Sequence, residues 1–178
     1  MLLIPEDEFT RDLHLETARL SLRPYREADR RDFTRLVSNP RLMEFMGGPA
    51  PRPDRLFESL LNPDRQSVDL GWAITWLDGG DYLGHIWIQG LHGSSPPQLG
   101  FVIAEEHQSQ YVATEASGAV LRHSLEALEL PVLEATVDGD HLESRRVLEK
   151  IGMVLDRTEH DADGPYLVYS RSSPEAST

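Results

Sequence analysis

The chain has 178 residues, of which 39% are hydrophobic and none is cysteine, and its formal net charge is −13. The length suits one domain, and the lack of cysteine excludes disulfides, thiolate zinc sites and a cysteine nucleophile. The acidic charge disfavours binding to a nucleic-acid backbone, and no apolar run is long enough for a membrane span or a secretory signal. We therefore expect a cytoplasmic protein that binds neither nucleic acid nor membrane.

Hydrophobic periodicity predicts a strand followed by helices in the first part of the chain. Apolar residues alternate from Leu15 to Leu22, which indicates a strand. An apolar stripe with helical spacing follows and ends at Asn39-Pro40. Two shorter helices are expected after it, RLMEFM and RLFESLL, on either side of a loop rich in turn residues.

From Asp69 onward the period changes to that of strands. A hairpin signal at Gly79-Gly80 separates LGWAITWLD from DYLGHIWIQGL, and QLGFVIA completes a meander. A strong helix follows from about Ala113 to Leu128, and then PVLEATVD predicts a strand, HLESRRVLEKIG a helix, and MVLDR with PYLVYSR a final strand pair. This order predicts one α/β (α+β) domain over residues 1–171, with a mixed sheet flanked by helices, and a disordered tail over residues 172–178.

Six segments stand in a characteristic order and spacing: LETARLSLRPYREAD, NPRLMEFMGG, LGHIWI, QLGFVIAEEHQSQYVATEA, LEATVDGDHLESRRVLEKIGM and YLVYSR. Together they resemble the GNAT superfamily of acyl-CoA-dependent N-acyltransferases, and within it the RimJ/RimL type of ribosomal-protein N-terminal acetyltransferase. The resemblance implies a GNAT-like, mostly antiparallel sheet of about six to seven strands. It also implies direct transfer of an acetyl group from acetyl-CoA to an amine, either a protein N-terminus or a small amine.

The resemblance also implies where the donor binds. The strand GFVIA would lie along the pantetheine arm through Val102 and Ile103, and the following loop and helix start would hold the diphosphate on unpaired amides. The residues implied there are Gln108, Ser109, Gln110, Tyr111, Val112, Ala113 and Thr114. The family has glycines at the positions of Ser109 and Tyr111. The tyrosine either fills this cradle or faces away and leaves the amides usable.

Candidate catalytic residues follow from the same resemblance. Gln98 stands where the family often has glutamate; it is no base, but it can orient the acceptor amine. Ser144 matches a serine that approaches the thioester sulfur and can donate to the leaving thiol, or it caps the helix. His141 stands at an asparagine position and is either a general base or a surface histidine. His85 either faces the acceptor beside Trp87 or is a buried structural residue.

Two functional hypotheses remain open at this level. The first is an active N-acetyltransferase whose acceptor side is shaped by the first helices and the loop MGGPAPRPD. The second is a non-catalytic descendant that has lost normal acetyl-CoA binding and keeps the fold as a binding module, since Gln98, Ser109, Tyr111 and His141 all depart from the family pattern. No histidine has metal-ligand spacing, so no metal is expected. A homodimer through a sheet edge or the meander is compatible with the pattern. Three arginines, Arg122, Arg145 and Arg146, either reach a CoA phosphate or are solvated or paired with other side chains.

Overall fold

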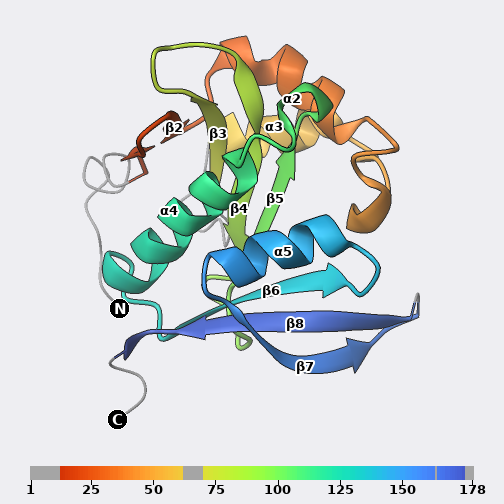
Figure 1. Cartoon of the computed structure of the whole chain (residues 1–178). Helices are drawn as coiled ribbons and strands as arrows, with labels where there is room; N and C mark the ends of the chain where they lie inside the picture. The colour runs from red at the N-terminus through yellow and green to blue at the C-terminus, as the bar shows by residue number, and fades with distance from the viewer. Residues whose placement is uncertain (1–12, 62–69, 163, 175–178) are drawn as a thin grey trace.

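A computed structural model describes residues 13–61, 70–162 and 164–174. Within this part the chain forms one sheet with the strand order β1-β2-β3-β4-β5-β6-β8-β7 (Figure 1). The strands are β1 (Leu15–Glu16), β2 (Leu20–Arg23), β3 (Leu70–Trp76), β4 (Tyr82–Gln89), β5 (Gln98–Ile103), β6 (Val132–Asp138), β7 (Val154–His160) and β8 (Pro165–Ser172). All neighbouring strands are antiparallel except β5 and β6, which are parallel.

Helices cover both faces of this sheet. They are α2 (Arg30–Val37), α3 (Pro53–Leu61), α4 (Val112–Glu126) and α5 (Leu142–Lys150), with short 3-10 turns η1 (Glu27–Asp29), η2 (Glu44–Met46) and η3 (Glu105–His107). Successive side chains of a strand face opposite sides, and β3 follows this rule: Trp72 packs in the core of α4 and α5, whereas Ala73 packs with Phe33 of α2 and Phe57 of α3. The predicted mixed α/β class is confirmed.

Three element boundaries differ from the prediction. The expected first strand is split into β1 and β2, because the Thr17 hydroxyl accepts hydrogen bonds from the amides of Arg19 and Leu20 and closes a turn. This split gives eight strands instead of six to seven. The expected helix RLMEFM is only the turn η2, since Gly47 follows with a φ of 79° and ends it. Strand β7 continues to His160, three residues beyond the expected end.

The C-terminal end of the chain is more ordered than predicted. Strand β8 includes Ser172, and the amide of Ser173 donates to the Pro131 carbonyl, so the predicted disordered tail does not begin at 172. Residues 175–178 and the predicted break at Asn62-Pro63 lie outside the described residues.

No helix in the described part is both long and apolar enough to cross a membrane.

Strands β5 and β6 pair at only one point and then separate. Their ladder is limited to Gln98 opposite Glu134, and the Glu134 amide donates to the Pro97 carbonyl at 2.9 Å. The buried Glu134 carboxylate accepts bonds from both Nη atoms of Arg157, at 2.7 and 3.0 Å, and from Gln98 Nε2 at 2.9 Å. This network holds β5 and β6 together at the Gln98–Glu134 pair, and the two strands diverge beyond that pair.

Candidate active site

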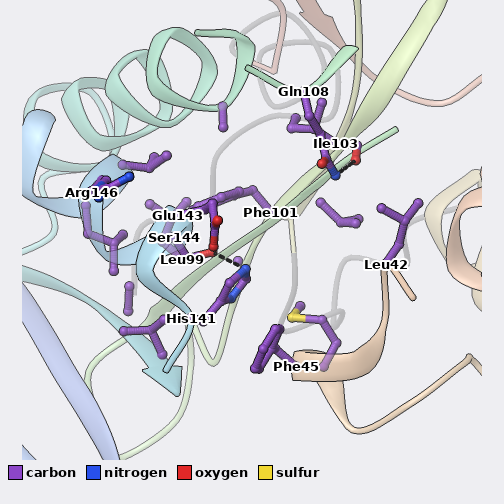
Figure 2. Close-up of a pocket in the computed structure, with 18 of the residues that line it drawn as sticks. Leu42, Phe45, Leu99, Phe101, Ile103, Gln108, His141, Glu143, Ser144 and Arg146 are labelled. Carbon is purple, nitrogen blue, oxygen red and sulfur yellow. Dashed lines mark hydrogen bonds between the residues drawn. The ribbon is translucent and has the colours of Figure 1, made fainter. Parts of the chain in front are cut away.

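A cleft of about 1090 Å³ opens where β5 and β6 diverge. One wall is β5 with the loop before α4, and the other is the end of β6 with α5; the segment from Arg41 to Met46 contributes from a third side (Figure 2). Pockets for small ligands and cofactors usually have volumes of about 300–1,000 Å³. The cleft is therefore large enough for an extended donor and an acceptor together.

Most of the residues predicted for the site line this cleft. They are Gln98, Val102, Ile103, Gln108, Ser109, Tyr111, Val112, Ala113, Thr114, His141 and Ser144. Residues Gln110 and His85 are not in its wall. The fold therefore brings together eleven side chains from four separate elements, which sequence spacing alone could only suggest.

The open edge of β5 presents backbone groups to the cleft. Glu134 bonds to the Pro97 carbonyl, and Gln108 Nε2 donates to the Ile103 carbonyl at 3.0 Å, so both carbonyls face the edge away from β4. Backbone groups alternate sides along a strand. Phe101 lies between them on the same alternation, so it turns its N–H and C=O toward the cleft. The sequence prediction named Val102 and Ile103 and missed Phe101.

The loop before α4 keeps a shape that suits glycine although it contains none. Ser109 has a φ of 60° and Tyr111 a φ of 63°, both in the left-handed region. A side chain there costs about 1–2 kcal/mol, and glycine would adopt this conformation without that cost. Tyr111 is 65% exposed and lines the cleft, and its ring lies against Lys150 of α5, with the ammonium 4.7 Å from the ring centre. Of the two sequence alternatives, the geometry supports a tyrosine that faces away.

The start of α4 presents free backbone donors to the cleft. The first bond within the helix runs from the Glu115 amide to the Tyr111 carbonyl, and no side chain caps the end. The amides of Val112, Ala113 and Thr114 therefore have no acceptor among the described residues, and all three residues line the cleft. Unpaired amides and the positive end of the helix dipole favour an anion at this position.

Arg19 stabilises the loop before α4 through hydrogen bonds from outside the cleft. Its Nη2 donates to the Gln110 carbonyl at 3.0 Å and its Nε donates to Glu115 at 2.7 Å; Thr17 donates to the same carboxylate at 2.6 Å. Burial alone would raise the pKa of Glu115, but these bonds from Thr17 and Arg19 outweigh it and lower the pKa. Gln110 is thus turned outward, with its side chain bonded to the Glu106 carbonyl, and its predicted place in the cradle is corrected.

Two cations of α5 face the same end of the cleft. Arg146 and Lys150 both line it, and the Lys150 ammonium lies 4.7 Å from the centre of the Tyr111 ring. Of the arginines predicted near a phosphate, Arg122 is not in the cleft wall, and Arg145 is turned to the Gly139 carbonyl at 2.9 Å. Sequence reasoning missed Lys150, although it is the only lysine in the chain and follows Arg146 by one helical turn.

His141 and Ser144 lie together at the start of α5. The Ser144 hydroxyl is 3.4 Å from His141 Nε2, and it makes no capping bond to the helix. The imidazole is half-buried and stacks on Phe45, with ring centres 4.2 Å apart. Burial lowers the pKa of His141, and the nearby Glu143, Asp138 and Glu44 oppose this in part. The arrangement provides a neutral imidazole base beside a hydroxyl donor.

His85 is a buried structural residue, which corrects its predicted substrate role. Its side chain is 6% exposed, its Nδ1 lies 2.6 Å from the Tyr25 hydroxyl, and its ring stacks on Trp87 at 4.7 Å. Burial lowers the pKa of His85 to about 4. Only Trp87 of this stack reaches the cleft wall. The alternating pattern located His85 on a strand correctly but could not tell which face of the strand borders the cleft.

Gln98 and the segment from Arg41 to Met46 complete the site. The amide nitrogen of Gln98 is bonded to Glu134, and its Oε1 is buried without a partner within the described residues. The acceptor side was expected to be shaped by the first helices and the loop MGGPAPRPD. The wall contains Arg41, Leu42, Glu44, Phe45 and Met46 of the expected helix RLMEFM, and of the loop it contains Met46 alone. Figure 2 shows Leu42 and Phe45 on the opposite side of the view from Arg146, with His141 and Ser144 between them. No group of acidic or histidine side chains in the described part could hold a metal ion.

Solved structures with the same fold fall among acetyltransferases. An acetyltransferase from Agrobacterium tumefaciens is 28% identical, with 97% of each chain covered and a TM-score of 0.76. The spermidine N-acetyltransferase from Vibrio cholerae, in complex with CoA and spermine, is 16% identical over 91% of this chain and 100% of its own, with a TM-score of 0.79. Mycobacterium smegmatis RimJ, in complex with CoA-disulfide, is 23% identical over 88% of this chain and 83% of its own, with a TM-score of 0.73. At these identities the last two show the fold alone.

The sequence itself matches a family model. The model is described as an acetyltransferase (GNAT) domain, and it matches residues 19–154. This match covers the open edge of β5, the left-handed loop, the start of α4 and the His141–Ser144 pair. The chain belongs to the GNAT family of acetyltransferases.

Proposed function

We propose that this protein transfers an acetyl group from acetyl-CoA directly to an amine and belongs to the RimJ/RimL-like branch of its family. The observation that carries the proposal is the left-handed backbone at Ser109 and Tyr111, which keeps the anion cradle open without glycine. A non-catalytic binding module would have no need to hold two non-glycine residues in a strained conformation beside uncapped amides.

The donor would lie along one wall of the cleft. Its diphosphate would accept hydrogen bonds from the amides of Val112, Ala113 and Thr114, which have no other acceptor in the described part. Its pantetheine arm would extend along β5, where Phe101 turns both backbone groups to the cleft. A backbone N–H at this edge can polarise the thioester carbonyl as negative charge develops on its oxygen.

His141 and Ser144 would carry out the proton transfers. The acceptor amine attacks the thioester carbon, so that the N–C bond forms and the C–S bond breaks. His141 Nε2 accepts the proton that the amine loses, and the Ser144 hydroxyl donates a hydrogen bond to the leaving sulfur. Their separation of 3.4 Å allows both groups to reach one reacting centre. Gln98, held by Glu134, stays a proposed orienting residue for the amine.

The acceptor end of the cleft suits a cationic amine attached to an apolar group. Glu44, Asp138 and Glu143 line the cleft around His141, and Phe45 and Met46 are 42% and 38% exposed beside them. Carboxylates attract an ammonium group before it is deprotonated. A peptide N-terminus with an apolar first side chain meets both features, which favours a protein N-terminus over a small polyamine.

The test measures thiol release from acetyl-CoA in the presence of each acceptor class. We expect turnover with short peptides that have a free N-terminus, slower turnover with spermidine and none with N-acetylated peptides. The Ser144→Ala variant should bind the donor normally and lose about tenfold or more in kcat. If no amine is acetylated and acetyl-CoA does not bind, the result would instead support the binding-module alternative, which has lost normal acetyl-CoA binding. Full activity in Ser144→Ala would remove the leaving-group role.

A further inference from the structure

The cations at the donor end of the cleft have no carboxylate partners. Arg146 and Lys150 are four residues apart on α5, so they lie on the same side of the helix. Neither forms an ion pair within the described residues, whereas Arg41, the third cation in the cleft wall, lies 3.8 Å from Glu105. In a chain with a net charge of −13, two unpaired cations that face a cleft indicate an anionic ligand.

Tyr111 determines where the Lys150 ammonium lies. Tyr111 is the residue immediately before α4, and its φ is 63°. The exposed ring then lies against α5, with the Lys150 ammonium 4.7 Å from its centre. An aromatic face attracts a cation, and a lysine side chain otherwise rotates freely in water. The ring therefore holds one positive charge beside the start of α4.

We propose that Lys150 binds the diphosphate of the acyl-CoA donor and that Tyr111 is the positioning residue for Lys150. The proposal rests on the proposed use of acyl-CoA. The amides of Val112, Ala113 and Thr114 contribute hydrogen bonds but no full charge, and Lys150 supplies a charge-assisted bond to the same group. Arg146 adds a second positive charge along the same side of α5.

This assignment reverses the expected effect of glycine at position 111. A tyrosine that obstructed the cradle would weaken donor binding, and Tyr111→Gly would strengthen it. A tyrosine that positions Lys150 strengthens donor binding, so its removal weakens it. Tyr111→Phe keeps the aromatic face and should behave like the original chain, which separates the role of the ring from that of the hydroxyl.

The experiment is a calorimetric titration at low salt with three ligands: CoA, dephospho-CoA, which lacks only the ribose phosphate, and pantetheine, which lacks all phosphates. Lys150→Gln should weaken CoA and dephospho-CoA equally, by about tenfold, and leave pantetheine unchanged. Tyr111→Ala should weaken the same two ligands about three- to fivefold, and Tyr111→Phe less than about twofold. Tyr111→Ala should add no further loss in the Lys150→Gln background, because the ring acts through the lysine.

Arg122→Gln is the matched control, because it removes the same charge from α4 outside the cleft wall. It should change binding less than about twofold at the same salt concentration. Tyr111 and Lys150 are both exposed, so their variants should fold normally, and thermal unfolding confirms this.

Three results would overturn the proposal. A loss confined to CoA would assign Lys150 to the ribose phosphate, tighter binding by Tyr111→Ala would show that the ring obstructs, and equal losses in Arg122→Gln would reduce the effect to overall charge. Binding of none of the three ligands by the unaltered chain would overturn the proposed function as well. That last result is distinguishable because it appears before any substitution is made.

Discussion

The two ends of the cleft are built in different ways. At the donor end the groups that face the ligand belong mainly to the backbone, namely the left-handed loop and the free amides of α4. At the acceptor end they are side chains, namely His141, Ser144 and the Phe45 ring that stacks on His141. The comparison explains why departures from the family pattern matter differently at each end. A backbone shape survives loss of its glycines when neighbouring contacts hold it, whereas a catalytic side chain changes its chemistry with every substitution.

The charges of the two ends also differ. Arg146 and Lys150 face the donor end, and Glu44, Asp138 and Glu143 surround His141 at the acceptor end. An anionic donor and a cationic acceptor would each be attracted to its own end. Substitutions at one end should therefore leave binding at the other end nearly unchanged, and the following predictions test that separation.

The largest effect is expected from His141→Gln. Glutamine keeps a polar side chain but cannot accept the proton of the amine, so kcat should fall about a hundredfold or more. The dissociation constant of acetyl-CoA should stay within about twofold, because the donor end is intact. Steady-state kinetics together with calorimetry measure both quantities. Unchanged kcat would exclude His141 as the base, and a large loss of donor affinity would contradict the separation of the two ends.

The pH dependence of kcat/KM for the amine should show an acid limb that belongs to the acceptor end. Burial places the pKa of His141 below 6.5. The neutral imidazole is the base, so it predominates at neutral pH, and the rate falls about tenfold per unit once the pH drops below that pKa. Donor binding measured over the same range should not show this limb. A profile that keeps the acid limb after His141→Gln would assign it to another group.

Arg19→Met should weaken the donor end with little effect on the acceptor end. The substitution removes the bonds to the Gln110 carbonyl and to Glu115 that hold the loop, and we expect about five- to tenfold weaker acetyl-CoA binding. The KM for the amine should change less than about twofold. Arg35→Met is the matched control, since it breaks an exposed ion pair with Glu106. Equal effects of both variants would show that Arg19 does not act through the loop.

The smallest effect is expected from Ser109→Gly. Glycine removes the left-handed strain, which stabilises the folded state, and it adds conformational freedom to the unfolded chain, which offsets part of that gain. Because the first effect is larger, the free energy of unfolding should rise by about 0.5–1 kcal/mol. Acetyl-CoA binding should not change, because the loop already has the conformation that glycine prefers. Glu129→Gly, at a φ of 52° outside the cleft wall, should give a similar gain in stability. Denaturant unfolding measures both. A loss of stability in Ser109→Gly would contradict the strained conformation.

The sequence allowed prediction of the fold and of the order of most elements, because hydrophobic period and turn residues are local signals. It also indicated that Gln108 and Ser144 belong to one site. It did not indicate the left-handed φ of Tyr111, since a tyrosine rarely adopts it and the stabilising contacts come from Arg19, far away in the chain. The Lys150–Tyr111 contact was missed for the same reason, because it depends on how α5 packs beside α4.

The most direct test of the central claim, that a cradle without glycine still binds an acyl-CoA donor, is a calorimetric titration of the unaltered protein with acetyl-CoA at low salt. The account predicts one binding site per chain with micromolar affinity, and a higher melting temperature when the donor is bound. No heat of binding and no thermal stabilisation at millimolar acetyl-CoA would contradict it, because the free amides of α4 would then not serve as a diphosphate site.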